Sequence, residues 1–161
     1  MAEVVKTDVE ERLKALNINL PDVPANPHPF APGVVSGNTV ILSGQTPKVD
    51  GRQQYVGIVG ESISMEEAQE AARTCTLNLL ASLKYLVGDL NRVKRVIKVN
   101  GYVAATPQFK EHPVVINAVS NMLYDVFGKE HQHARIAVGL ASLPGGAPVE
   151  VEMTVEIDRK F

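Results

Sequence analysis

Apolar and polar residues alternate most regularly in the last segment of the chain, residues 149–158, where five apolar side chains alternate with five polar or charged ones. Because successive side chains of a strand point to opposite faces, this pattern predicts a strand with one buried and one polar face. Compact apolar and β-branched runs predict three further strands, over residues 38–44, 93–104 and 135–140.

Apolar residues that recur every three or four positions predict two long helices, over residues 65–87 and 114–127. Ser64 and Glu67 have the capping-box spacing at the start of the first helix, and Gly88 follows its end. The apolar side of this helix contains several alanines, which indicates close packing against a flat surface such as a sheet.

The N-terminal part of the chain has weaker patterns. Residues 10–16 have the apolar spacing of a short helix. The prolines between residues 21 and 32 predict an extended, irregular segment, because each proline fixes its own φ and lacks a backbone donor. Asp50 and Gly51 predict a tight turn.

In order, the chain is predicted to form one or two strands, a helix, a strand, a second helix and two final strands. Two helices that cross over one face of a mixed sheet make a two-layer α+β domain, and 161 residues suit a single domain. The opposite face of such a sheet is only partly polar, so we expect it to be buried against other copies of the chain.

Composition and charge argue against several kinds of partner. The chain has 16 basic and 18 acidic residues and 5% aromatic residues with no tryptophan, so we expect no nucleic-acid partner. Its one cysteine, Cys75, excludes an intrachain disulfide and fits a reducing compartment. The first residues do not resemble a signal peptide and no apolar run approaches the roughly 20 residues of a membrane helix, so we expect a cytoplasmic protein with no membrane partner.

Motifs for other chemistry are missing or weak. The glycines at 57 and 60 are not followed by the Lys-Ser or Lys-Thr of a phosphate-binding loop, and no Gly-x-Ser-x-Gly elbow occurs. His131 and His133 alternate, but two imidazoles without a third protein ligand make a weak metal site, and we favour a turn or interface role for them. We therefore expect neither a metal ion nor an organic cofactor.

Several motifs, taken in sequence order, resemble the Rid (YjgF/YER057c/UK114) family. They are Pro-Ala-Asn-Pro-His-Pro-Phe at 24–30, Leu-Ser-Gly-Gln at 42–45, Gly-Asp-Leu-Asn-Arg-Val at 88–93, Ala-Arg at 134–135, Leu-Pro at 143–144 and Val-Glu-Val-Glu at 149–152. The resemblance covers about residues 24 to 158. We therefore expect residues 1–23 to be an N-terminal extension with a short helix, and residues 24–161 to be a Rid-like domain.

The resemblance implies a chorismate mutase-like fold, with two helices on one face of a mixed sheet. It also implies a homotrimer, in which three sheets form an inner barrel and ligand clefts lie at the subunit interfaces. The best-understood members of the family hydrolyse reactive enamines and imines to 2-keto acids and ammonia, whereas others are linked to ribonuclease, chaperone or regulatory roles. The resemblance therefore implies a site more firmly than a reaction.

The resemblance identifies Arg135 and Glu150 as the main site residues. Arg135 matches the arginine that grips the substrate carboxylate, for which its planar, permanently charged fork is suited. Glu150, fifteen positions later, matches the catalytic glutamate, which can hold a water against the imine carbon and exchange its proton. Two alternatives stay open: an arginine paired with an acid, and a solvated glutamate on a face that Glu152 and Glu156 share.

The resemblance implies three further residues of the cleft. Gly44 would let a ligand approach the backbone closely, although a plain strand-end turn explains it equally well. Phe30 stands where the family often has a tyrosine, and it can pack on a ligand but cannot donate a hydrogen bond. Ser120 or Asn121 stands where the family has a polar residue on the second helix.

Two more departures lie beside the arginine, where Ile136 and Ala137 replace the serine and cysteine of typical deaminating members. The sequence thus leaves open whether the chain is an enzyme. The leading interpretation is an enamine or imine deaminase, and the alternative is a non-catalytic trimer that binds or senses a small carboxylate such as a 2-keto acid. An endoribonuclease is the weakest interpretation, because the chain is slightly acidic and poor in aromatic residues.

Overall fold

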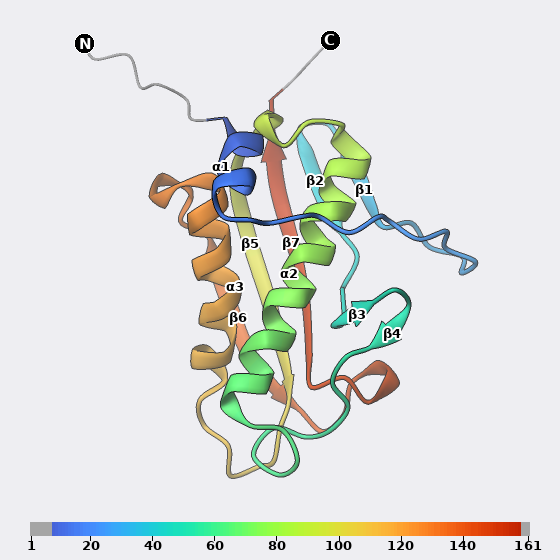
Figure 1. Ribbon diagram of the computed structural model, residues 1–161, viewed down its shortest axis with the longest axis vertical. Helices are drawn as coiled ribbons and strands as arrows, with labels where there is room; N and C mark the ends of the chain where they lie inside the picture. The colour runs from blue at the N-terminus through green and yellow to red at the C-terminus, as the bar shows by residue number, and fades with distance from the viewer. Residues whose placement is uncertain (1–7, 159–161) are drawn as a thin grey trace.

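One mixed sheet of five strands, in the order β1-β2-β7-β5-β6, forms one layer of the molecule (Figure 1). The computed structural model describes residues 8–158, apart from the side chain of His131. The strands are β1 (Gly33–Ser36), β2 (Thr39–Leu42), β5 (Val93–Ala104), β6 (Ala134–Leu140) and β7 (Val149–Ile157). Neighbouring strands are antiparallel except β5 and β6, which are parallel.

The alternation predicted for the last strand is confirmed in β7, whose residues are buried and half-buried in turn along its whole length. It defines two faces of the sheet. The covered face carries Val149 and Met153, which lie in the core, and the open face carries Glu150 and Glu152. Because β7 lies between β2 and β5, this division sets the orientation of side chains across the sheet.

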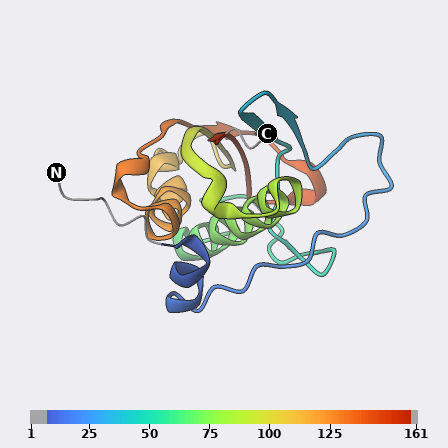
Figure 2. The ribbon, with the colours of Figure 1, turned by 90° about the horizontal axis from the view of Figure 1, so that it is seen from above.

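Two helices, α2 (Met65–Val87) and α3 (His112–Phe127), pack on the covered face (Figures 1 and 2). The helix predicted over 65–87 is confirmed at both ends, and the second begins two residues earlier than predicted. The buried side of α2 is rich in small residues, which allow the close packing expected: Ala68, Ala71, Ala72, Cys75 and Thr76. The two-layer α+β class is thereby confirmed.

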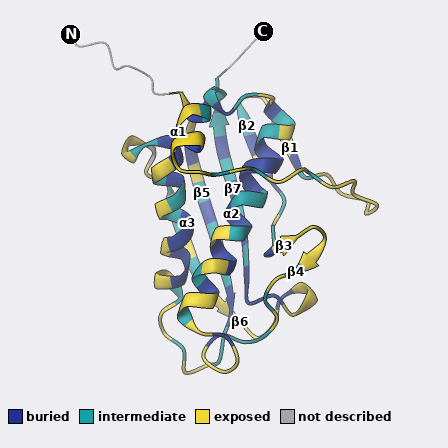
Figure 3. Cartoon of the chain, in the orientation of Figure 1, coloured by how far each residue is buried: buried dark blue, intermediate teal, exposed yellow. Residues whose placement is uncertain are grey.

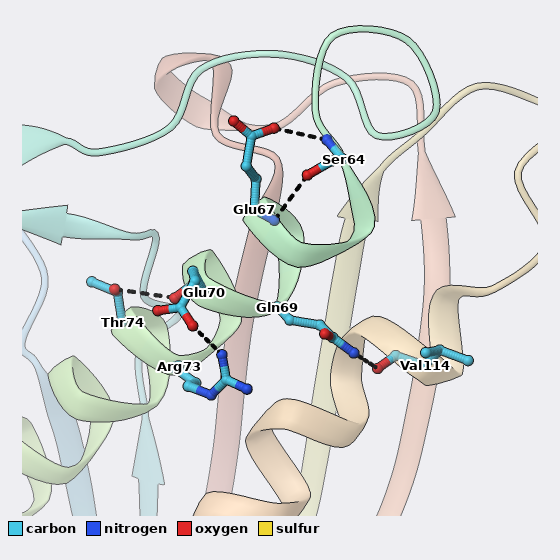
Figure 4. A network of polar contacts seen from close by, with 7 residues as sticks. All are labelled: Ser64, Glu67, Gln69, Glu70, Arg73, Thr74 and Val114. Atoms are coloured by element: carbon cyan, nitrogen blue, oxygen red, sulfur yellow. Dashed lines mark hydrogen bonds and ion pairs between the residues drawn. The ribbon is translucent and has the colours of Figure 1, made fainter.

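The start of α2 has the predicted capping box (Figure 4). The Ser64 hydroxyl accepts the Glu67 backbone N–H at 3.1 Å, and the Glu67 carboxylate accepts the Ser64 N–H at 2.8 Å. In the next turn, the Gln69 amide donates to the Val114 carbonyl of α3 at 3.2 Å. The bond from Gln69 joins the N-terminal parts of the two helices and helps to position α3 over the sheet.

β1 is the second early strand that the sequence left open, and three of its four residues are exposed. A separate small hairpin consists of β3 (Lys48–Val49) and β4 (Arg52–Gln53). Its turn is at Asp50 and Gly51, with φ of 50° and 77°, so the predicted tight turn is confirmed.

The short helix α1 (Val9–Ala15) is attached near the C-terminal end of α2. Its first N–H donates to the Asn91 side chain at 2.9 Å, and Glu10 forms an ion pair with Lys84 of α2 at 2.8 Å. Residues 16–32 then run along the outside of the helical layer without helix or strand, as the prolines predicted (Figures 1 and 2).

The open face combines carboxylates with exposed apolar side chains. Ile41 is in register with Thr154 of β7, and Ile136 with Asn100 of β5. Four large aliphatic residues of this face are 41–58% exposed: Val34, Ile41, Ile136 and Leu140. By contrast, the apolar residues of the covered face are mostly buried beneath the helices (Figure 3). Burial of the open face against other copies stays a prediction. No helix in the described part of the chain is long and apolar enough to cross a membrane.

Gly101 of β5 allows α3 to approach the sheet closely. A Cβ at this position would lie 2.6 Å from Cδ1 and Cγ1 of Ile116, which is fully buried. Asn117 and Ser120 follow on the same helix. The close approach at Gly101 therefore also sets the height of these two polar side chains above the sheet.

We expect Gly101→Ala to lower the free energy of unfolding by about 1–3 kcal/mol, because its methyl group overpacks the space that Ile116 fills. Denaturant unfolding measures this loss. Ile116→Ala alone costs about 2–5 kcal/mol by opening a cavity, but it also makes room for the methyl group. The double variant should therefore lose less than the sum of the single losses, whereas strict additivity would contradict this account of Gly101.

Candidate functional site

Arg135 of β6 points toward α3 on the covered face. Its Nη1 donates to the Asn117 side-chain oxygen at 2.9 Å and to the Ser120 hydroxyl at 3.1 Å. In the sheet Arg135 is in register with Val99, which is buried in the core on the same face. The structure thus brings together two of the predicted site residues, Arg135 and Ser120, while Asn121, the alternative to Ser120, is exposed and outside this group.

One edge of the Arg135 guanidinium has no hydrogen-bond partner among the described residues. Arg135 forms no ion pair with any acidic residue between positions 8 and 158, and its Nε and Nη2 have no hydrogen-bond partner among those residues. Parallel donors of this kind match the two oxygens of a carboxylate. The first alternative interpretation, an arginine paired with an acid of its own chain, does not apply to this part of the structure.

Ser120 connects the arginine to His133. The Ser120 hydroxyl lies 2.9 Å from His133 Nε2 and accepts a hydrogen bond from Arg135. Because an arginine can only donate, the serine's own hydrogen is available for His133 when Nε2 is unprotonated. His133, two residues before Arg135 on the chain, therefore borders the arginine group.

Glu150 and Gly44 meet on the open face. A Cβ at Gly44 would lie 2.6 Å from Glu150 Oε1, so the glutamate occupies the space that any larger residue would need. The next residue, Gln45, forms two backbone hydrogen bonds with Val151, at 2.8 and 3.0 Å. This bridge holds the end of β2 beside β7 and keeps Gly44 against the carboxylate.

Side chains from α2 and the hairpin fix the segment that follows Gly44. The Asn78 amide of α2 donates to the carbonyls of Thr46 and Lys48 at 3.1 and 3.0 Å. The Gln53 amide of β4 donates to the Thr46 hydroxyl at 2.9 Å. The backbone beside Glu150 is therefore held from both sides.

A polar cluster surrounds Glu152, the next residue on the open face. Glu152 Oε1 accepts a hydrogen bond from the Tyr102 hydroxyl at 2.5 Å and from the Asn100 amide at 3.0 Å. The bond to Glu152 is the main reason that the pKa of Tyr102 is raised to about 12. Burial raises the pKa of Glu150 above its ordinary value, and the neighbouring Glu152 raises it further.

Arg135 and Glu150 do not meet within one chain. Glu150 is in register with Tyr102, and Tyr102 with Val138 of β6. Arg135 lies three positions before Val138, an odd step along a strand, so its side chain is on the opposite face. The structure therefore contains two groups: the arginine group on the covered face and the carboxylate group on the open face.

Phe30 lies apart from both groups, in the loop before β1, and is 59% exposed. Its ring stacks near that of His28, with centroids 6.0 Å apart and an angle of 5° between the rings. The loop is tied to the residue before Gly44, because the Ser43 hydroxyl donates to the Ala31 carbonyl at 2.6 Å. Within residues 8–158, no group of three metal-ligating side chains lies close enough to hold an ion.

Three residues of these groups were not predicted from the sequence. Asn117 precedes Ser120 by three positions, the spacing of neighbours on one helix face, so a test of helical spacing would have found it. The faces of Asn100 and Tyr102 could not be predicted by counting alternate residues from the start of β5. The reason is that β5 has two register shifts against β7, and each shift changes which residues point to which face.

Comparisons with known proteins agree with the fold. A family model described as "YjgF/chorismate mutase-like, putative endoribonuclease" matches residues 10–154. Protein TCP17 of Trypanosoma cruzi is 41% identical over 98% of this chain and 99% of its own length. A 2-iminobutanoate/2-iminopropanoate deaminase of Salmonella typhimurium is 31% identical over 81% of this chain and 89% of its own. The crystal structure of Atu1372 from Agrobacterium tumefaciens, 43% identical, superposes with a TM-score of 0.85 over 96% of this chain and 94% of that one.

We expect Glu150→Gln to gain stability relative to the unchanged protein as the pH rises above about 4.5, the ordinary pKa of a glutamate. The folded-state pKa is raised, so the folded protein binds this proton more tightly. The unchanged protein therefore loses stability between the ordinary and the raised pKa, and the glutamine variant is spared that loss. Thermal unfolding from about pH 4 to about pH 8 measures the difference.

Glu156→Gln is the matched control, because Glu156 lies on the same strand and face but is ion-paired with Arg95 at 2.8 Å. It should show no such gain. A glutamine variant at position 150 that loses stability relative to the unchanged protein over this pH range would show that the surroundings favour the charged carboxylate.

Proposed function

The chain belongs to the YjgF/chorismate mutase-like (Rid) family, as its motifs predicted, and we propose that it hydrolyses the enamine or imine of a small carboxylic acid to a carbonyl compound and ammonia. One observation carries this proposal: Arg135 offers an unoccupied donor edge with no acidic partner among the described residues. The similarity to a protein named 2-iminobutanoate/2-iminopropanoate deaminase supports the reaction class.

Arg135 binds and orients the substrate. Its Nε and Nη2 take the two carboxylate oxygens, while Asn117 and Ser120 hold Nη1 and so limit rotation of the guanidinium. A small 2-imino or 2-enamino acid meets this requirement because its carboxylate is directly bonded to the reacting carbon. A fixed carboxylate therefore also fixes the reacting carbon.

Glu150 positions and deprotonates the attacking water molecule. Its carboxyl group holds a water molecule against the imine carbon and accepts a proton as the new C–O bond forms. That proton passes to the nitrogen. Glu150 then takes the proton of the new hydroxyl group and passes it to the nitrogen as well, so that the C–N bond breaks and ammonia leaves as the carbonyl forms. The lack of a side chain at Gly44 lets the carboxylate lie directly against the end of β2.

One site combines Arg135 of one chain with Glu150 of a second. The two side chains lie on opposite faces of the sheet and α3 holds the arginine, so one chain alone does not direct both at a substrate. Exposed apolar residues of the open face, such as Ile41 and Ile136, favour burial between copies. We propose a homotrimer, as the family resemblance implies, and place it in the cytoplasm, as the N-terminal sequence led us to expect.

A second candidate function is a trimer that binds a small carboxylate without turnover. It is favoured by the missing polar groups at Phe30, Ile136 and Ala137, since Ile136 is exposed on the open face and Ala137 packs against the core. Saturable binding of a 2-keto acid, without release of ammonia from any imine, would favour this function over the deaminase. Ribonuclease activity is less favoured by the net charge of -2.

We expect the purified protein to accelerate pyruvate formation from 2-aminoacrylate, generated in place from serine by a pyridoxal-phosphate enzyme. Arg135→Ala should lower kcat/KM by about 10- to 100-fold, the effect expected when hydrogen bonds to a charged group are lost. Glu150→Gln should lower kcat by roughly 100-fold or more, because proton exchange is lost. Arg52→Ala, which removes an exposed arginine on the β3–β4 hairpin, is the control and should be fully active. Equal rates with and without the protein would reject the deaminase.

Mixing the two inactive variants tests whether the site is shared. Arg135→Ala and Glu150→Gln, refolded together in equal amounts, should recover about a quarter of the activity of the refolded unchanged protein. Random assembly gives each site an intact arginine half of the time and an intact glutamate half of the time. If both residues acted within one chain, every site would keep one defect and the mixture would stay as inactive as each variant refolded alone.

A further inference from the structure

The open face carries two neighbouring glutamates on one strand, and among the described side chains only Glu152 has hydrogen-bond donors. Glu150 and Glu152 are two residues apart on β7, so both point to the open face. Tyr102 and Asn100 both donate to Glu152, at 2.5 and 3.0 Å. No described side chain donates a hydrogen bond to the carboxylate of Glu150.

We propose that Glu152, held by Tyr102 and Asn100, is a positioning residue that keeps a proton on Glu150, so that Glu150 meets the substrate as an acid. This inference rests on the proposed function for its role in the reaction. Its structural part, the division of charge between the two glutamates, does not depend on any substrate.

We infer that Glu150 and Glu152 differ in their hold on a proton because their surroundings differ. Two neighbouring carboxylates that are partly removed from water do not both ionise readily, because each negative charge opposes the other. Glu152 accepts hydrogen bonds from Tyr102 and Asn100, whereas Glu150 accepts none from a described side chain, so a proton on Glu150 disrupts no hydrogen bond. Glu150 is therefore the carboxylate on which we place the proton, and its raised pKa agrees with this assignment.

Within one chain, the other described groups around Glu150 do not offset this effect. Gly44 and Gln45, at the end of β2, bring no charge. Cys75 of α2 lies beneath the sheet, where its thiol donates to the Val149 carbonyl at 3.7 Å, and burial raises its pKa so that it stays neutral. On β5, Lys98 is on the open face but opposite Thr154, four residues from Glu150. No described lysine or arginine forms an ion pair with Glu150.

An acid at this position changes the order of the proposed steps. Glu150 first gives its proton to the imine nitrogen, or to the terminal carbon of an enamine, and the iminium that forms is attacked by water more readily. As a carboxylate it then takes a proton from the attacking water. It returns that proton to nitrogen, ammonia leaves as the C–N bond breaks, and the protonated carbonyl gives its proton back to Glu150. The cycle thus consumes one water and restores the acid.

The first test needs no substrate. The Glu150 carboxyl carbon, labelled with carbon-13 and identified by its loss in Glu150→Gln, is titrated by NMR in the unchanged protein and in Glu152→Gln. We expect Glu150 to lose its proton at lower pH in Glu152→Gln. In Glu156→Gln, with the same change of charge on the same strand and face, the Glu150 titration should not move. An unmoved titration in Glu152→Gln overturns the proposal.

The second test asks whether the proton matters for turnover. In Glu152→Gln, and to a smaller extent in Tyr102→Phe, the limb of the pH profile of kcat/KM that falls as Glu150 ionises should move to lower pH. A residue with only a structural role would lower the rate equally at every pH, and that result would overturn the proposal. If the unchanged protein shows no turnover, the deaminase function fails, and the NMR titration alone decides the division of charge. If Glu152→Gln does not fold, both measurements are made on Tyr102→Phe instead.

Discussion

The alternation of side chains along β7 is the constraint on which the rest of the structure depends. This central strand sends its valines and Met153 beneath α2 and α3 and its glutamates to the open face. A shift of one residue in its pairing with β2 or β5 would exchange the two sets and place carboxylates in the core. The cost of burying an unpaired charge there is large, so the register of the whole sheet is strongly determined.

The same division explains why the polar chemistry of the chain falls into two separate groups. On the covered face, α3 comes close enough at Gly101 for Asn117 and Ser120 to hold Arg135. On the open face, neighbouring strands bring Tyr102 to Glu152. Each group is built from elements distant in sequence, and each is rigid because its backbone belongs to a central or a parallel pair of strands.

Elements with a strong period could be predicted from the sequence almost to the residue, as Met65–Val87 and Val93–Ala104 show. β1 could not, because its four residues do not alternate and three of them are exposed. Motif matching identified Arg135 and Glu150, but their placement on opposite faces depends on strand register, which the motifs do not encode. Contacts such as that between Asn117 and the arginine arise from tertiary packing of α3 on β6, and local sequence carries little information about them.

In the shared site that we propose, a single chain, whose arginine and glutamate lie on opposite faces, carries the complementary halves of a site and never a whole one. Its chemistry then becomes a property of concentration, because mass action alone decides how many halves find partners. Dilution would lower the activity of such a protein without any inhibitor. Its activity in the cell would rise more steeply than its concentration. The placement of two side chains on one sheet thus connects the strength of an interface to the rate of a reaction.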